Sequence, residues 1–502
     1  MESRYFLCLL LSLALLGCHP RQELGGGKMI NDNADLTFAG RVDVFNDMST
    51  RSYPTDPAEI KAHRITFKGL RVVLYSVSPS NKELPQEVAY AFDFDINADK
   101  GTFNGKDYEI INNGDAFSFK TNKSIKVAPN DYIIYFFTTP GVSLKEATKV
   151  GQPFSALKEP MAYGKEDFQY DKLLGNHYYS ATPTKISKSL FSDNTPGKTY
   201  EIPISNLTAL NAMLSVKWQP VIKDSDYELL KDLLIFYPDV QNKKYLLFPE
   251  NDTELETALG LKYPKDANYS GFSGKSLTEL SSDFLYTSDV EMPYFTSSSN
   301  STDKINVYRM IPENTMSGNE KGIAVITRVI MYISIIPKAL KEHLSAQKLS
   351  STCLSWVSWN GSYYEGSEFL SKYNALKSKS NRTNEEEKLI TEGNKIIKDG
   401  ELIKEGYEDD NIKYYHCGNS YYAIPITHYT KDALGEKSSN TGYYGVVRNH
   451  HYQLDIRSFA TIGRANYKYL PITGEYVDNV KLTPGININD MKDIVNVIDV
   501  LE

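Results

Sequence analysis

The sequence predicts a mainly β protein, and three stretches of it carry that prediction. Residues 452–457 alternate apolar and polar side chains, the period of two that is typical of a half-buried strand in an antiparallel sheet. Residues 64–77 and 131–138 are rich in β-branched and aromatic residues, and a proline follows each run. These patterns recur along the chain, so we expect packed sheets rather than a helical core.

The second half of the chain repeats the strand pattern and adds a few helices. Further strands are expected at residues 321–336, 421–426 and 445–459. Helices are expected at residues 226–234, 337–348 and 385–398. Thr383 or Asn384 can cap the last helix, whose first turn is acidic. Residues 377–406 are highly charged, which predicts a solvated insertion between strands.

The first residues have the features of a bacterial lipoprotein signal. An apolar run from Tyr5 to Leu16 follows Arg4 and is too short to span a bilayer. It ends in Leu-Leu-Gly-Cys, which resembles a lipobox, so residues 1–17 are predicted to be removed and Cys18 to carry lipid. The polar residues 19–33 then read as a flexible tether. We therefore expect export and attachment to the outer membrane through lipid.

Composition narrows the classes of function. The chain has 502 residues, a formal net charge of −8 and 36 tyrosines. No cluster of Lys and Arg interleaves with aromatic residues, which argues against nucleic acid as a partner. After processing, two cysteines remain, Cys353 and Cys417. An oxidising periplasm would permit a disulfide between them, although nothing local shows that they come within reach.

The segment Tyr443-Tyr-Gly-Val-Val-Arg-Asn-His-His-Tyr452 resembles a strand near the end of fimbrillins, the subunits of type V pili. It is most similar to the shaft-subunit branch of the short (minor) fimbria. Residues 199–216, which contain Ala-Met-Leu, resemble the strand that closes the first fimbrillin domain. The resemblance implies two tandem transthyretin-like antiparallel β-sandwich domains, at residues 52–221 and 222–470, followed by a tail at 471–502. It also implies a cell-surface fimbria, self-association into a filament and contact with related subunits, with a role in adhesion and biofilm formation.

The same resemblance implies maturation by an arginine-specific protease that removes the first strand. Residues 36–45 alternate well enough to be that strand, within a lipidated propeptide at 18–51. An exposed turn-like segment follows, and Arg51–Ser52 is the predicted scissile bond. Arg41 is the rival site, and an ordinary strand followed by an uncut loop is the alternative.

The tail is the expected donor strand for the next subunit. Val480, Leu482, Ile494, Ile498 and Val500 are its candidate donor residues. The same segment also has apolar residues at helical spacing, so strand and helix both stay open. It lacks a proline-rich spacer, which favours a tip, accessory or anchor subunit as the alternative to a shaft subunit.

Motifs for catalysis, cofactors or metals were sought and not found. No nucleophile elbow, phosphate loop or zinc motif occurs, so neither an enzyme nor a cofactor is predicted. Residues 93–101 alternate oxygen ligands but lack the features of an EF-hand. His416 and Cys417, with His428, are better explained by strand alternation than by a metal. Two tryptophans, Trp356 and Trp359, with neighbouring tyrosines could form a glycan platform, which would suit a surface glycan-binding lipoprotein, although core packing is the commoner fate of such residues.

Overall fold

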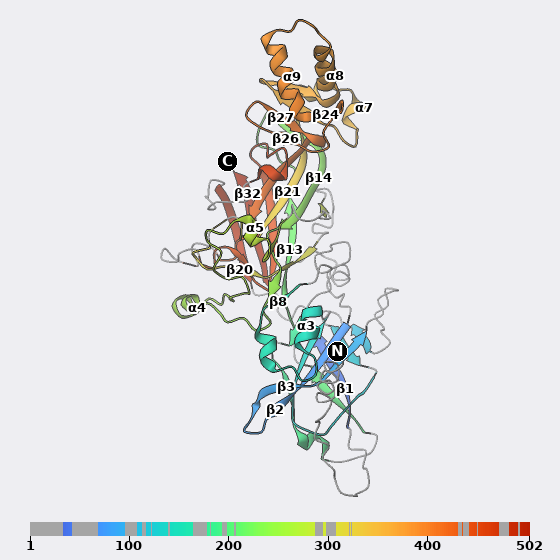
Figure 1. Cartoon of the computed structure of the whole chain (residues 1–502), viewed down its shortest axis with the longest axis vertical. Helices are drawn as coiled ribbons and strands as arrows, with labels where there is room; N and C mark the ends of the chain where they lie inside the picture. The colour runs from blue at the N-terminus through green and yellow to red at the C-terminus, as the bar shows by residue number, and fades with distance from the viewer. Residues whose placement is uncertain are drawn as a thin grey trace, which may run out of the picture.

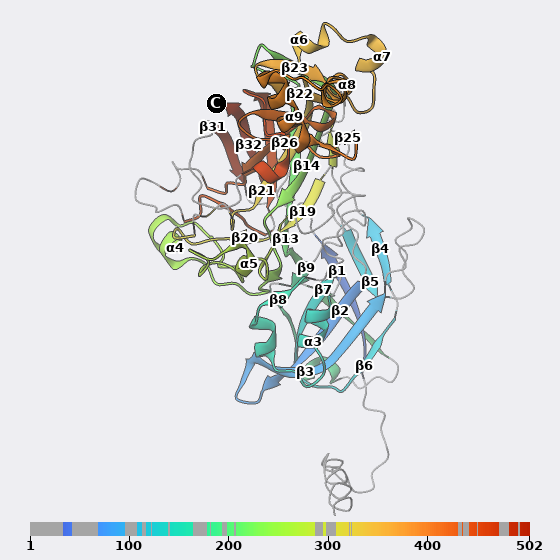
Figure 2. The ribbon, with the colours of Figure 1, turned by 45° about the horizontal axis from the view of Figure 1, so that its top comes forward.

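The computed structural model describes residues 34–42, 69–95, 108–112, 117–121, 123–138, 141–163, 178–180, 182–192, 198–204, 207–286, 295–297, 308–320, 322, 324–429, 434, 441–448, 450–470, 481–489 and 492–501. Strands dominate these residues and form two β-sandwiches, one after the other along the long axis of the molecule (Figures 1 and 2). A module with two helices extends from the far end of the second sandwich. The predicted mainly β fold with two tandem sandwiches is confirmed.

The first sandwich packs two sheets face to face. One sheet has the order β11-β1-β5-β4, with β6 also on β1: β11 (Thr199–Ile204), β1 (Ala34–Val42), β5 (Phe117–Thr121), β4 (Tyr108–Asn112) and β6 (Ile125–Val127). The other has the order β12-β9-β7-β2-β3, with β10 on β7: β12 (Leu207–Ala209), β9 (Tyr178–Ser180), β7 (Tyr132–Thr138), β2 (Gly69–Ser78), β3 (Asn81–Asp95) and β10 (Thr184–Ile186). Alternate residues of these strands form one apolar core between the sheets.

The outer face of the second of these sheets is also buried. Helix α3 (Val142–Ala147) and the 3₁₀ turn at Phe154–Lys158 cover it. Tyr245 and Leu247, from beyond the first sandwich, join the same cluster. There β16 (Lys244–Tyr245) pairs with β8 (Met161–Ala162). The two sandwiches therefore share a core and a short ladder.

The second sandwich is built in the same way. Its first sheet has the order β19-β13-β30-β32-β31: β19 (Tyr308–Pro312), β13 (Asn211–Trp218), β30 (His451–Phe459), β32 (Lys492–Leu501) and β31 (Lys481–Asn489). Its second sheet has the order β18-β14-β21-β28: β18 (Phe295–Ser297), β14 (Tyr227–Asp239), β21 (Arg328–Pro337) and β28 (Asn419–Pro425). A cluster of buried residues from both sheets, among them Leu214, Phe236, Ile333, Ile424 and Leu454, fills the space between them.

Long connections on the second sandwich form short ladders and helices of their own. These elements are β15 (Gln241–Asn242) with β17 (Phe284–Leu285), β20 (Asn314–Thr315) with β29 (Gly445–Val446), α4 (Thr253–Leu259) and α5 (Leu277–Leu280). Asp252 and Ser276 cap the two helices through their side chains. In the described part of the chain, no helix is both long and apolar enough to cross a membrane.

An insertion between β21 and β28 forms the module at the far end. Helices α6 (Lys338–Lys341) and α7 (Ala346–Leu349) lead into a sheet of order β23-β22-β27-β26: β23 (Ser362–Glu365), β22 (Trp356–Trp359), β27 (Ile412–Tyr415) and β26 (Tyr407–Glu408). Two longer helices, α8 (Gly366–Lys377) and α9 (Asn384–Ile396), and the hairpin of β24 (Ile397–Lys398) with β25 (Glu401–Leu402) complete it. Thr383 caps α9 with a capping box, as one of the two predicted residues.

Three expectations about these elements need correction. Residues 227–234 lie in strand β14 rather than in the helix predicted at 226–234, because β14 pairs with β21 at residues 227–229 and again at 234–239. The boundary predicted near residue 221 falls earlier, because β13 pairs with β19 and β30 of the second sandwich. His416 and Cys417 form a 3₁₀ turn after β27 and do not alternate along a strand.

Candidate assembly site

The first strand, β1, lies inside its sheet rather than at an edge. It runs parallel to β11 from Asp35 opposite Thr199 to Gly40 opposite Ile204. On its other side it is antiparallel to β5 and to β6. The sheet is therefore continuous across β1 only while this strand is in place.

Side chains of β1 also fill the centre of the first core. Leu36 and Phe38 are fully buried, and Ala34 is nearly so. The Phe38 ring lies edge-on to Phe136, with 5.6 Å between ring centroids. The backbone N–H of Phe38 donates to Thr121 Oγ1 at 2.9 Å. Removal of β1 would open a groove between β11 and β5 that is lined by apolar side chains and by unpaired backbone groups of two strands.

Only one of the two candidate cleavage sites lies in the described part of the chain. Arg41 lies within β1, where its backbone pairs with Ser118 of β5. Arg51 and Ser52 follow β1 in the sequence but lie outside the described residues, as does Cys18. A protease that needs an extended, unpaired substrate would have to break the β1–β5 ladder to cut at Arg41.

The tail forms two strands in the described structure. β31 and β32 form an antiparallel hairpin, and β32 runs parallel to β30. Ile494, Ile498 and Val500 occupy the register positions opposite Tyr452, Ile456 and Phe459, and Leu482 is opposite Val500. Val480 lies outside the described residues. Of the strand and helix alternatives, the structure shows the strand.

The segment that carries the family resemblance is a structural junction. Gly445 has a φ of 142°, and a Cβ at this position would lie 2.3 Å from the Tyr263 hydroxyl. Arg448 and Glu313 form a buried ion pair, with Arg448 Nε 3.0 Å from Glu313 Oε2. The Arg448 guanidinium also donates to the carbonyl of Leu246, at 2.6 Å. The arginine thus joins the last strands of the second sandwich to the loop that contacts the first.

Tyr452 stabilises the same junction through its hydroxyl group. Its hydroxyl accepts from the backbone N–H of Val447 at 2.8 Å and lies 2.9 Å from His428 Nδ1. Both side chains are buried, and burial lowers the pKa of His428 well below its ordinary value while it raises the pKa of Tyr452. Neither group is placed to meet a ligand from solvent, so we assign both to the fold.

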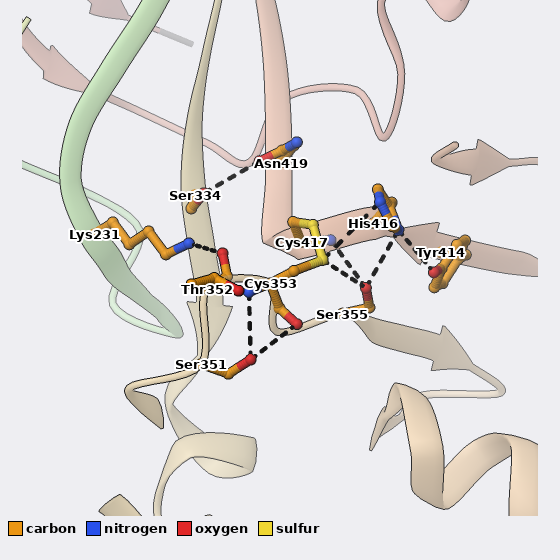
Figure 3. Close-up of a disulfide and its surroundings, with 10 residues drawn as sticks. All are labelled: Lys231, Ser334, Ser351, Thr352, Cys353, Ser355, Tyr414, His416, Cys417 and Asn419. Carbon is orange, nitrogen blue, oxygen red and sulfur yellow. Dashed lines mark hydrogen bonds between the residues drawn. A yellow bond between two sulfur atoms is a disulfide. The ribbon is translucent and has the colours of Figure 1, made fainter. Parts of the chain in front are cut away.

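Cys353 and Cys417 form a disulfide at the base of the insertion (Figure 3). Their Cα atoms are 4.3 Å apart. His416 lies beside the bond, with Nε2 4.0 Å from Cys353 Sγ, and burial lowers the pKa of its imidazole. His428, the third residue of the metal group considered from the sequence, is instead hydrogen-bonded to Tyr452.

The aromatic residues of the insertion do not make an exposed platform. Trp356 and Trp359 are buried at 1% and 7% exposure. Trp356 stacks on Tyr415 at 4.2 Å between centroids, and its indole N–H donates to the Ile335 carbonyl. Asp93, the first residue of the acidic run considered for calcium, pairs with Arg71 at 2.7 Å. These side chains stabilise the fold, so they do not support the glycan-platform alternative.

The comparison with protein families finds a match for the last part of the chain. Residues 413–496 match the family described as major fimbrial subunit protein type IV, fimbrillin, C-terminal. This region of the chain is therefore fimbrillin-like. The matched residues begin in β27 and include β28, β30 and most of the tail hairpin, so they contain the Arg448 junction. The match supports a fimbria-associated surface protein.

The comparison with solved structures gives matches of low identity. A chain named as a cell adhesion protein from Parabacteroides distasonis has 10% identity and a TM-score of 0.37, and the alignment covers 94% of this chain and 99% of that chain. The fimbrial anchor protein Mfa2 from Porphyromonas gingivalis has 8% identity and a TM-score of 0.24, with coverage of 66% and 95%. These similarities are too weak to assign a role to this chain. No curated protein matches it.

Two contacts that matter to the site were not predicted from the sequence. One is the parallel pairing of β11 with β1, and the other is the ion pair between Glu313 and Arg448. Glu313 lies 135 residues from Arg448 in sequence. The one available signal was the arginine itself, because an arginine inside an apolar strand run predicts an acidic partner but does not say which one.

Proposed function

We propose that this chain is a structural subunit of a cell-surface fimbria, exported as a lipoprotein precursor and polymerised by donor-strand exchange. Cys18 would carry the lipid that holds the precursor at the outer membrane. An arginine-specific protease would cut after Arg51 and release the propeptide with β1. The tail of a second copy, or of a related subunit, would then fill the vacated place. The proposal includes no catalytic role, and adhesion would be a property of the assembled fibre.

The position of β1 is the observation that supports this proposal most directly. A terminal strand at a sheet edge could be lost with little consequence, but β1 has neighbours on both sides. Its loss would leave β11 and β5 with unpaired backbone donors and acceptors in an apolar groove. Another extended segment in the same position would restore both ladders, which is the principle of strand addition.

The energy at stake is large enough to drive assembly. Burial of Leu36 and Phe38 contributes about 1.5–3 kcal/mol for each side chain. Each ladder hydrogen bond adds roughly 0.5–1.5 kcal/mol. A donor strand with two or three apolar residues at alternate positions would recover most of this stabilisation. Since the donor and acceptor ends lie on different parts of the chain, repetition of the contact gives an open filament.

The tail has the sequence pattern that a donor needs. Ile494, Ile498 and Val500 recur on one face of an extended strand, with Asn496 between the first two. In the described structure, β32 pairs with β30 of its own chain. Donation would therefore require the hairpin to leave this edge, and the ladder given up with β30 would offset part of the gain.

Maturation can be tested with two arginine variants. The purified precursor would be treated with an arginine-specific protease, and the product followed by intact mass, N-terminal sequencing and electrophoresis without heating. We expect a new N-terminus at Ser52 and polymers that survive mild detergent. Arg51→Ala should abolish both. Arg41→Ala is the matched control, because it removes an arginine of the same propeptide and should leave cleavage and polymers unchanged.

The opposite pattern would overturn the assignment. Cleavage that is lost in Arg41→Ala and kept in Arg51→Ala would move the scissile bond into β1. Efficient cleavage without polymers would contradict donor-strand exchange. Removal of residues 481–501 provides the second arm, since a cleaved subunit without a tail should accept a donor but fail to extend the filament.

The tail hairpin also favours a second candidate, an accessory, tip or anchor subunit that keeps its lipid and does not polymerise. Both tail strands are already paired within the chain, as in a subunit that has no donor to offer. An uncut protein with lipid on Cys18, recovered as a monomer from sheared surface material, would support this candidate over the shaft subunit.

A further inference from the structure

The disulfide at the base of the insertion belongs to a group of three side chains, two cysteines and one histidine, whose types bind soft metals. The Sγ atoms of Cys353 and Cys417 and a ring nitrogen of His416 all lie within 4.8 Å of one another. It is the one group of three or more His, Cys, Asp or Glu ligands found in the described part of the chain. The three residues come from two segments that the disulfide joins, Cys353 from the connection between α7 and β22, and His416 and Cys417 from the turn after β27.

The imidazole is oriented for such a role by its neighbours. The Tyr414 hydroxyl lies 3.1 Å from His416 Nδ1, and Ser355 Oγ lies 3.5 Å from the same nitrogen. Ser355 Oγ also accepts from the backbone N–H of Cys417 at 2.9 Å. With Nδ1 facing these hydroxyls, Nε2 is left toward Cys353 Sγ (Figure 3). Outer partners on one ring nitrogen are the usual support of a histidine that binds metal through the other.

The distances suit a tetrahedral ion once the sulfur–sulfur bond is open. Zinc binds thiolate sulfur at about 2.3 Å and imidazole nitrogen at about 2.0 Å, which puts ligand atoms roughly 3.6–3.8 Å apart. Cys353 Sγ and His416 Nε2 are 4.0 Å apart, which is already close to this spacing. The two sulfurs would need to separate to a similar distance. Cys353 is exposed, so rotation of its side chain about Cα–Cβ can provide that movement.

We propose that reduction of the Cys353–Cys417 disulfide converts this position into a binding site for Zn²⁺ or a similar soft divalent ion, with His416 as the third ligand. Two molecules of a low-molecular-weight thiol supply two electrons and two protons, which gives two cysteine thiols and one external disulfide. The ion then displaces the two thiol protons, and water takes the open fourth position. The site is distinct from the segments of strand exchange, since its three residues lie in the insertion and none of them belongs to β1 or to the tail strands.

The proposal predicts two alternative cross-links between Cys353 and Cys417. In the oxidised state the disulfide ties Cys353 to Cys417. In the reduced state the ion ties the same two residues and adds His416. Because the two forms exclude one another, metal binding should be absent from the oxidised protein and should protect the reduced protein from reoxidation.

Cobalt offers a direct test, because thiolate ligands give it an intense charge-transfer band. The protein would be reduced with a phosphine, freed of reductant without oxygen, and titrated with Co²⁺ and then Zn²⁺. We expect one Co²⁺ per chain with a thiolate band that zinc abolishes, and no band from the oxidised protein. His416→Gln should weaken Co²⁺ binding by at least about tenfold, by analogy with the loss of supporting residues at metal sites. His343→Gln, which changes an exposed histidine outside the group, is the matched control.

Three results would overturn the proposal. The first is the absence of a thiolate band from the reduced protein. The second is equal affinity in His416→Gln and wild type, which would leave two thiols without the imidazole. The third is equal weakening by His416→Gln and His343→Gln, which is the result expected if reduction unfolds the insertion and the ion binds loose chain.

Discussion

The buried ion pair of Arg448 and Glu313 gives the sharpest test of how the second sandwich is held together. The substitution Glu313→Gln keeps the size of the side chain and removes its charge. The Arg448 side chain is 8% exposed and that of Glu313 is 1% exposed. The guanidinium also donates to two backbone carbonyls, those of Leu246 and Leu247. It therefore cannot move to water without breaking those bonds.

The magnitude follows from this burial. Removal of one partner of a buried pair typically costs about 3–5 kcal/mol, because the remaining charge stays uncompensated. For a domain of this size each kcal/mol lowers Tm by roughly 2–4 °C, so we expect a fall of about 6–20 °C. The more exposed pair of Lys379 and Glu386 provides the control, and Glu386→Gln should leave the unfolding midpoint nearly unchanged, because water screens the pair.

Tryptophan fluorescence in urea is a suitable assay because of where the tryptophans lie. The chain has 3 of them, Trp218, Trp356 and Trp359, and all belong to the second sandwich or its insertion. Their transition therefore reports on this part of the molecule and not on the first sandwich. A midpoint for Glu313→Gln no lower than that of Glu386→Gln would refute the reasoning.

Three further predictions concern the same half of the molecule. Gly445→Ala should lower the expression of folded protein or cost several kcal/mol in the same assay, since its Cβ would meet the Tyr263 hydroxyl; an unchanged midpoint would show that this contact can relax. His428 is buried with a lowered pKa, so the unfolded state binds its proton first, and stability present above about pH 6.5 should fall as the pH drops. Relative to His428→Gln, the wild type should lose stability as the pH falls from 6.5 to 5, and parallel pH profiles would exclude the buried imidazole as the cause. The double variant Cys353→Ser/Cys417→Ser opens a loop with a sequence separation of 64 and should cost about 2–5 kcal/mol, with faster proteolysis inside the insertion than in the first sandwich.

Local patterns predicted the elements whose neighbours agree with them. The strand expected at residues 131–138 is β7, and Thr383 caps α9. β7 is buried on both faces, as its continuous apolar run requires, and α9 turns one apolar face to the core of the insertion. The sequence did not show that residues 445–459 form two separate strands. The expected single strand includes the turn that carries Arg448 and separates β29 from β30.

Pairing between distant strands determines the elements that local sequence patterns did not predict correctly. Residues 226–234 contain good helix formers, yet residues 227–234 belong to a strand, because pairing with β21 at residues 227–229 and from 234 onward overrides weak propensities. The resemblance of residues 199–216 to the strand that closes the first fimbrillin domain placed β13 in the first sandwich, but its partners β19 and β30 come from much later in the chain. The candidate site depends on the same kind of information, because the neighbours of β1 lie at residues 199–204 and 117–121.

The insertion has a consequence for how such a surface can diverge. Ser334 of β21 is the register partner of Asn419 of β28, so the chain leaves the sheet and returns to it on adjacent strands. A tight hairpin turn could join the same two strands without any change in strand order. The module can therefore vary in length and sequence, or be replaced by an unrelated segment, while the host sandwich keeps its topology.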